Sequence, residues 1–408
     1  MKHQHIYHLL SILNPAQKEE LSKQLQKVPG KTGKFTGDLS NKLILTLMNC
    51  SEIPTQGAVI DAIYGSNETY SANAYKKLIQ SVYKKTVQLV IAGFASPNFV
   101  KTPPHEYIKI DLLNKIILIK ILRLKGANVN LLNFLQDEII NMAEEYEFYP
   151  ILMEKLATKK IYHGMKYGFE NVQKLSGQIS LTERSFKSLV QAIEWSHELK
   201  PKINKVNFGK KEKDEILRQI DILEKEVNAT GSNSILYYML NHKLYYYNIE
   251  GSIEKRKAIA NKIIELIQNC KAVYSDNRLG IIYSNLSEIE ACELNYASAI
   301  LNLEKAKKYF PKNSKNYFLT ILELFRCHLH TKDLVMAAKA CKHLKTGFLS
   351  FFNEFEKKQI RLLEACLFIK EGKYEEALYI MNDEKFENKN PSFEFWRRVY
   401  QILLHLKL

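Results

Sequence analysis

The sequence predicts an all-α protein built largely from antiparallel helical hairpins, and three observations carry this prediction. The 408 residues include only 16 glycines and 10 prolines, fewer than turn-rich β folds need. Apolar residues recur at helical spacing through long segments of the chain. From about residue 235 the sequence repeats itself, because four alanines follow one another at intervals of 39, 38 and 40 residues: Ala260, Ala299, Ala337 and Ala377.

The first part of the chain is expected to form a small helical domain. It opens with a helix that Asn14 caps and Pro15 begins. Three more helices are expected after it, over residues 39–50, 55–64 and 71–93. Residues 93–104 combine glycine, serine and proline and form the clearest break in the chain. The predicted organisation is therefore an N-terminal domain of residues 1–96 and a hairpin array of residues 97–408.

The second part begins with three amphipathic runs, expected as helices over residues 105–125, 129–145 and 147–165. The connector between the first two is short, which predicts an antiparallel pair. Residues 170–230 are expected to form two long polar helices separated near Pro201. The second of them has apolar residues at coiled-coil spacing: Ile216, Ile220, Leu223 and Val227. Two heptads are too few for a coiled coil, so packing on neighbouring helices is favoured.

Two segments of the repeated region resemble the tetratricopeptide repeat. In residues 295–311, Tyr296 opens the expected second helix and Pro311 closes it, with small residues at Ala299 and Ala306. Residues 363–378 match more closely and keep Ala365, Phe368, the turn glycine Gly372, Tyr374 and Ala377 in register. The family period is about 34 residues, so longer connectors or helices are expected here. The likeness covers residues 235–385 best, although Leu294 stands where the turn glycine is expected.

The resemblance implies a stack of helical hairpins, a tetratricopeptide-like solenoid, whose first helices line a concave face. Such a face holds extended ligands, so a non-enzymatic scaffold or regulator that binds a protein or peptide is expected. In this register Glu288, Arg326 and His330 point toward the concave face and are the predicted binding residues. Arg326 would form a fork with a peptide carboxylate or a phosphate, or would simply be solvated.

The charge of the chain leaves a second function open. The formal net charge is +15, from 59 basic against 44 acidic residues, which favours contact with nucleic acid or anionic lipid. Residues 301–350 carry ten basic and three acidic side chains. A nucleic-acid-associated helical protein is therefore the alternative. Five tyrosines could stack on bases, although helical spacing favours packing: Tyr237, Tyr238, Tyr245, Tyr246 and Tyr247.

The most apolar segment, residues 108–124, is interrupted by five charged side chains and is too short and too polar to cross a membrane. The apolar stretch at the N-terminus is too short for a signal peptide. Six cysteines without a CxxC pair are typical of reduced, buried thiols. The protein is accordingly expected to be cytoplasmic, without a membrane span.

No catalytic or cofactor motif is found in the sequence, so no enzyme activity, metal or cofactor is expected. The glycine loop of residues 30–37 lacks the glycine that a phosphate loop needs, because Leu25 occupies that position. The histidines at positions 3, 5 and 8 are expected to lie in a frayed terminus. The best metal-like cluster is not expected to converge, since Cys341 should face the hairpin core and His330 should face away: Cys327, His328, His330, Cys341 and His343.

Overall fold

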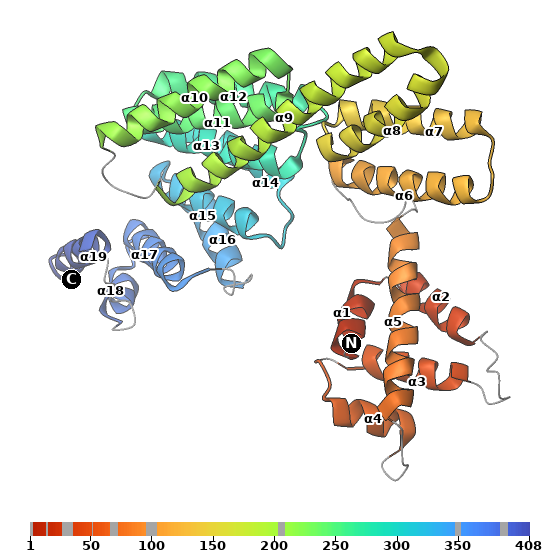
Figure 1. Cartoon of the computed structure of the whole chain (residues 1–408). Helices are drawn as coiled ribbons and strands as arrows, with labels where there is room; N and C mark the ends of the chain where they lie inside the picture. The colour runs from red at the N-terminus through yellow and green to blue at the C-terminus, as the bar shows by residue number, and fades with distance from the viewer. Residues whose placement is uncertain are drawn as a thin grey trace. The chain divides into compact units, whose positions relative to one another are not determined.

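The computed structural model consists of α-helices, with no strand among the residues that it describes (Figure 1). Those residues are 3–13, 15–26, 36–50, 52–65, 72–94, 104–202, 209–346, 352–383 and 391–408. The chain divides into two compact units, Met1–Thr102 and Pro103–Leu408, and each is described by itself. Residues 30–35, most of the glycine loop, lie outside the described part of the chain.

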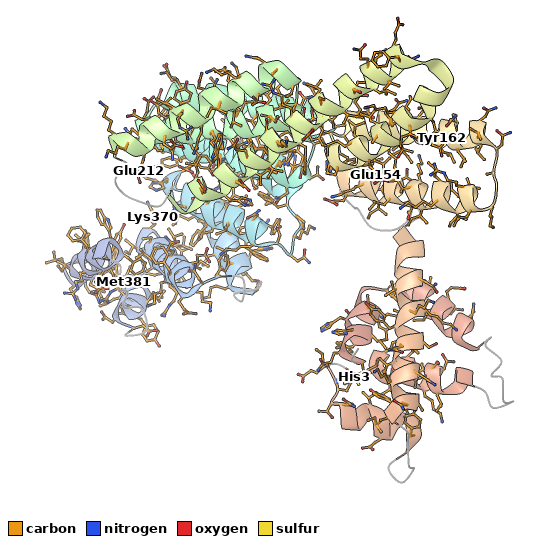
Figure 2. The ribbon with its side chains drawn as sticks, viewed as in Figure 1. His3, Glu154, Tyr162, Glu212, Lys370 and Met381 are labelled. Atoms are coloured by element: carbon orange, nitrogen blue, oxygen red, sulfur yellow. The ribbon has the colours of Figure 1, made fainter. Side chains whose placement is uncertain are left out.

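The first unit contains α1 (His3–Ile12), α2 (Pro15–Gln26), α3 (Thr36–Met48), α4 (Gln56–Tyr64) and α5 (Ala72–Phe94). The long helix α5 packs against α1, α2 and α3, and its Ile79 and Val82 lie in a shared apolar core. The expectation of a frayed terminus is wrong for His3. Its ring is buried, and Nε2 lies 2.8 Å from the carbonyl oxygen of Pro54, which holds the start of α1 in place (Figure 2).

The second unit is a series of fourteen described helices: α6 (Pro104–Leu124), α7 (Val129–Glu145), α8 (Tyr149–Tyr167), α9 (Phe169–Lys202), α10 (Lys210–Thr230), α11 (Asn233–Glu250), α12 (Ile253–Asn269), α13 (Asp276–Cys292), α14 (Tyr296–Tyr309), α15 (Lys315–His330), α16 (Leu334–Thr346), α17 (Glu354–Lys370), α18 (Tyr374–Asn382) and α19 (Pro391–His405). Helices that follow one another in sequence pack side by side, and α13, α15 and α17 are also neighbours. The predicted stack of antiparallel helical hairpins is confirmed.

The hairpins of the repeated region share one turn geometry. In each, a residue with positive φ ends the first helix, and the next backbone N–H donates to a carbonyl oxygen five residues back, at 2.9–3.0 Å. This is the Schellman arrangement, which satisfies carbonyl groups that the helix end leaves free. The positive-φ residues are Gly251, Leu294, Lys332 and Gly372. Because the turn recurs, successive hairpins bend back in the same way.

Counted from these turns, Ala260 does not occupy the position in the first repeat that the alanine spacing predicts. Ala299, Ala337 and Ala377 each come five residues after the turn residue, and all three are fully buried. Ala260 is fully buried as well, but it comes nine residues after Gly251, one helical turn later. The equivalent of the other alanines is the buried Arg256. The alanine shifts by one turn because residues four apart share a helix face, so either position can make room for the facing helix.

Leu294 is expected to carry backbone strain, because its φ is 60° and its side chain is 72% exposed. A left-handed conformation costs a non-glycine residue about 1–2 kcal/mol, and glycine avoids that cost at an entropic penalty. Leu294→Gly should therefore raise the free energy of unfolding by about 0.5–1 kcal/mol in urea titrations. Gly372→Ala, at the equivalent turn with φ 77°, should lower it by a similar amount. Changes of the same sign would contradict this account.

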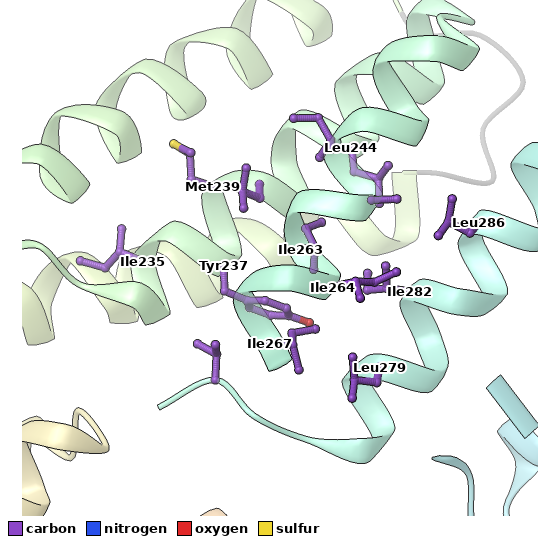
Figure 3. Close-up of a cluster of buried hydrophobic side chains, with 14 of the residues drawn as sticks. Ile235, Tyr237, Met239, Leu244, Ile263, Ile264, Ile267, Leu279, Ile282 and Leu286 are labelled. Carbon is purple, nitrogen blue, oxygen red and sulfur yellow. The ribbon is translucent and has the colours of Figure 1, made fainter. Parts of the chain in front are cut away.

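The largest core of the second unit lies where α11, α12 and α13 meet (Figure 3). Tyr237 of α11 points between Ile267 and Leu279, and the guanidinium of Arg278 lies 4.4 Å from its ring centroid. The neighbouring α10 also packs as an ordinary helix. Its Ile216 and Ile220 contact Leu199 and Tyr245, and its Leu223 and Val227 join the large core.

We expect His242 to make the stability of this core depend on pH. Its ring is fully buried, Nδ1 is 2.8 Å from the carbonyl oxygen of Tyr238, and Nε2 has no hydrogen-bond partner in the described part of the chain. Burial lowers the pKa of His242 below 6.5. Above that value the ring is neutral in the folded and unfolded states. Below it the unfolded state binds more protons, so the free energy of unfolding falls as the pH drops.

We expect His242→Leu to reduce this acid sensitivity. Thermal melts between about pH 7.5 and 5 should show a smaller loss of stability for the variant, by at most about 2 kcal/mol. His105 is partly buried, and burial lowers its pKa as well. It remains in the variant, so part of the loss of stability at low pH should persist. An identical pH profile for the two proteins would rule out His242 as a source.

Candidate functional site

Glu288, Arg326 and His330 line one groove between α13 and α15, with a cavity of about 510 Å³. Each residue sits on the first helix of its hairpin, Glu288 on α13 and the other two on α15. Glu323, Arg326 and His330 follow one another on α15 at spacings of three and four residues, which keeps their side chains on one helix face. The structure therefore brings the three predicted side chains together, and α14 adds Tyr296 from its first turn.

Arg326 is already partly engaged. Its Nη1 lies 3.1 and 3.0 Å from the two carboxylate oxygens of Glu323, one turn earlier on α15. No residue in the described part of the chain accepts from its Nε or Nη2, so donors remain for a ligand. Desolvation raises the pKa of Glu323, Arg326 opposes that rise, and Glu288 adds to it. The two carboxylates thus face the same groove.

His330 forms a flat aromatic surface with Tyr296. The two rings are stacked, with centroids 4.4 Å apart and planes 2° from parallel. Desolvation lowers the pKa of His330, and the cations of Lys370 and Arg326 lower it further. The imidazole is therefore neutral at pH 7, and it offers a stacking surface and a ring nitrogen without a charge. Lys370 belongs to the last turn of α17, the next first helix.

The carboxylate of Glu288 contacts Arg256, the residue at the alanine position of the first repeat. Arg256 of α12 is buried, and its Nη2 donates to Oε1 of Glu288 over 3.2 Å, while the carboxylate itself is largely exposed. Nε of Arg256 is buried without a hydrogen-bond partner in the described residues. A buried arginine of this kind needs its carboxylate, because an unpaired charge inside a protein is costly. Glu288 therefore combines a structural contact with a position in the groove.

A second cavity of about 210 Å³ extends the groove toward the start of α15. It shares Ser284, Asn285 and Glu323 with the first cavity. Its far end contains Asn316, whose Nδ2 donates to Oδ1 of Asn277 over 3.2 Å. Hydroxyl and amide groups thus lie among apolar side chains in the groove, an arrangement that can hydrogen-bond an extended backbone.

The cysteines and histidines near this groove lie in three separate places. Cys327 and His330 line the groove, His328 and His343 line another cavity, and Cys341 lies in the hairpin core. Burial raises the pKa of Cys327 and of Cys341 to about 11, so both are thiols at neutral pH. Among the described residues, no three His, Cys, Asp or Glu side chains gather as a metal site.

Sequence reasoning missed three features of the groove. Glu323 lies three residues before Arg326 on the same helix, and that spacing is the signal that would have found it. The sequence marks Tyr296 only as the residue that opens a helix, and its stacking on His330 has no local signal. Arg256 was hidden because the alanine pattern pointed to Ala260.

Comparison with solved structures finds chains that resemble this one, and one of them is described here. No family model matches the chain, and no curated protein matches its sequence. A solved structure of a signal-transduction ATPase with numerous domains and a tetratricopeptide repeat sensor, from Pyrococcus horikoshii, is 12% identical with a TM-score of 0.45. The match covers 97% of this chain and 60% of that protein. The array of helical hairpins is shown by the packing and turns of this chain's own helices.

Proposed function

We propose that the chain is a non-enzymatic scaffold or regulator whose groove between α13 and α15 binds an extended segment of a partner protein. The observation that carries this proposal is the convergence of Glu288, Glu323, Arg326 and the Tyr296–His330 pair on one cavity of about 510 Å³. The mixture of charges suits a segment with a basic side chain close to an acidic or carbonyl acceptor. The former would meet the two carboxylates, and the latter the free donors of Arg326.

The chemistry of the groove supports binding over catalysis. Cys327 is a thiol at neutral pH, since its pKa is raised to about 11, and the neutral His330 is stacked against a tyrosine. A hydrolytic or transfer site needs a nucleophile activated by an adjacent base. The mixed polar and apolar lining of the second cavity instead suits a ligand bound through its backbone.

Arg326→Ala tests this proposal. The full-length chain and the variant are presented to an immobilised library of random peptides, and the retained peptides are resynthesised for titration calorimetry. The variant should bind them about 10–100 times more weakly, because hydrogen bonds to a charged group contribute about 1.5–3 kcal/mol. Its thermal melt should be unchanged, since an exposed pair three residues apart on a helix contributes little to stability.

The matched control is Arg218→Ala. Arg218 is exposed on α10 and pairs with Glu215 three residues away, at 2.7 Å, as Arg326 pairs with Glu323. Peptides that bind the groove should be retained by this variant at full affinity. Equal losses in the two variants, or peptides that ignore Arg326→Ala, would count against the groove as the binding site.

A second candidate function, contact with nucleic acid, is favoured by lysines of α14 to α16. Lys308, Lys312, Lys339 and Lys342 are exposed, and none has an ion-pair partner in the described residues. Lys339 also lines a cavity of about 220 Å³ with Tyr317, whose ring could stack on a base. Binding of single-stranded RNA should weaken steeply with salt, with a slope of about 0.7 per phosphate contacted in a log–log plot. A flat salt response would exclude this candidate.

A further inference from the structure

The helix α6 has two apolar faces, and only one of them is buried. Leu112, Ile116 and Ile119 pack against α7 in the core of the first hairpin. The exposed side of the helix presents a second stripe, called here the outer stripe, whose members are 46–89% exposed: Leu113, Ile117, Ile121 and Leu124. Their spacing of four, four and three residues places them in one row along about 16 Å of helix. A helix that served its own hairpin alone would carry polar residues there.

Lysines border the outer stripe. Lys109, Lys120 and Lys125 are exposed, and none forms an ion pair with another described residue. Lys115, on the inner side, is instead paired with Glu138 and with Asp111. The acidic residue on the exposed side, Glu106, lies in the first turn of α6, before the stripe begins. The stripe is therefore an apolar ridge with positive charge along its borders.

The apolar surface continues around the end of this helix. Leu124 is followed by the short turn to α7, where Val129 is again exposed. The guanidinium of Arg123 lies 5.6 Å from the ring centroid of the exposed Tyr162, so Tyr162 of α8 lies beside the last turn of α6 (Figure 2). A tyrosine and an arginine at the edge of an aliphatic surface are typical of residues that lie between an apolar and an aqueous phase.

The shape and charge of this ridge select its occupant. A second copy of the chain would bring the same three lysines against one another, which opposes pairing. A protein that docks on a helix usually supplies an apolar groove of matching shape. A fluid bilayer needs no such match, since its interface accepts an apolar ridge while the lysines at the borders reach the headgroups. None of the described helices is long and apolar enough to cross a membrane, so contact would be at the surface.

We propose that the outer stripe of α6 binds an anionic membrane surface, with its aliphatic side chains in the interfacial region and Lys109, Lys120 and Lys125 against lipid headgroups. This surface is separate from the groove between α13 and α15 and does not depend on what that groove binds. The binding is peripheral and reversible. It weakens with salt, because exposed lysines act through screened electrostatic attraction.

Co-sedimentation of the full-length chain with vesicles tests this proposal. Phosphatidylcholine vesicles with about one part in three of phosphatidylglycerol should retain the protein at low salt, and pure phosphatidylcholine should retain far less. Ile117→Glu with Ile121→Glu should reduce retention more than tenfold. Replacing Lys109, Lys120 and Lys125 by Gln should cost about fivefold per lysine, the equivalent of about 1 kcal/mol each. The matched control adds two glutamates at exposed apolar positions elsewhere, Leu301→Glu with Val335→Glu.

Three outcomes would overturn the proposal. The first is that the native chain does not bind the anionic vesicles at low salt. The second is that the glutamate pair on α6 and the control pair reduce retention equally, with circular dichroism showing that both variants are folded. The third is sedimentation equilibrium showing a dimer that the Ile117→Glu, Ile121→Glu variant dissociates, which would assign the stripe to a second copy.

Discussion

Replacing Glu147 with alanine is expected to lower the free energy of unfolding by about 3 kcal/mol. Glu147 lies in the turn between α7 and α8, and its carboxylate accepts hydrogen bonds from the backbone N–H groups of Asn233 and Ser234, at 2.7 and 2.9 Å. It also accepts from the hydroxyl of Ser232 at 3.0 Å. These donors form the N-terminus of α11, where unpaired N–H groups and the helix dipole favour an anion.

The backbone of Glu147 strengthens this prediction. Its φ is 53°, and alanine would bear the same left-handed conformation, so the substitution isolates the carboxylate. Without it, two N–H groups of α11 lose their partners, and Ser232 keeps its bond from Tyr149, at 2.7 Å. Each hydrogen bond to a charged group contributes about 1.5–3 kcal/mol. Urea titration of the full chain, followed by circular dichroism, measures the loss.

Glu145→Ala is the control for Glu147. Glu145 lies two residues earlier and forms an exposed ion pair with Lys271 at 2.6 Å, a contact that also joins distant parts of the chain. Exposed pairs contribute about 0–1 kcal/mol, so this variant should unfold near the native midpoint. Glu147→Gln should fall between the two, since its amide oxygen still accepts but carries no charge. Similar losses for Glu145→Ala and Glu147→Ala would show that the helix cap contributes no more to the free energy of unfolding than an exposed ion pair does.

The helices were largely predictable from the sequence, because apolar spacing and turn residues are local signals. The expected helix over residues 129–145 coincides with α7, and the expected helix over residues 39–50 is α3, displaced by two or three residues. The turns were only partly predictable. Gly372 marks its left-handed position, but Leu294 and Lys332 adopt the same conformation without a glycine. At these two positions the packing of the two helices outweighs the preference of a non-glycine residue for negative φ. The identity of the residue alone does not reveal this.

The sequence predicted that the three binding residues lie together because each was assigned to the inward face of the first helix of a hairpin. Glu288, Arg326 and His330 line one cavity for that reason. What holds them could not be read from the sequence. Arg256 reaches Glu288 across 32 residues, and Tyr296 stacks on His330 from another helix. Such contacts depend on how two helices are rotated and offset against each other, and the alanine pattern gave that register one turn wrong at Ala260.

Gly280 should be the least tolerant small residue of the array. It lies within α13, and a Cβ atom built on it would approach the ring of Phe310 to 2.6 Å. Phe310 ends α14 and is buried, so its ring has little room to move. Gly280→Ala gains about 1 kcal/mol of helix propensity but overpacks the contact at a cost of about 1–3 kcal/mol. Gly280→Val adds two more methyl groups than Gly280→Ala and should lower the free energy of unfolding by more than about 3 kcal/mol.

Gly177 and Phe310 separate the steric effect from the backbone effect. Gly177 lies in the interior of α9, and an added Cβ there meets nothing within 4 Å, so Gly177→Ala should raise the free energy of unfolding by about 1 kcal/mol. Phe310→Leu replaces the ring that Gly280 faces with a smaller aliphatic side chain. Combined with Gly280→Ala, it should cost less than the sum of the two single changes, because the smaller side chain makes room for the methyl group. Additive losses would mean that the close approach of α13 and α14 is not what requires glycine at position 280.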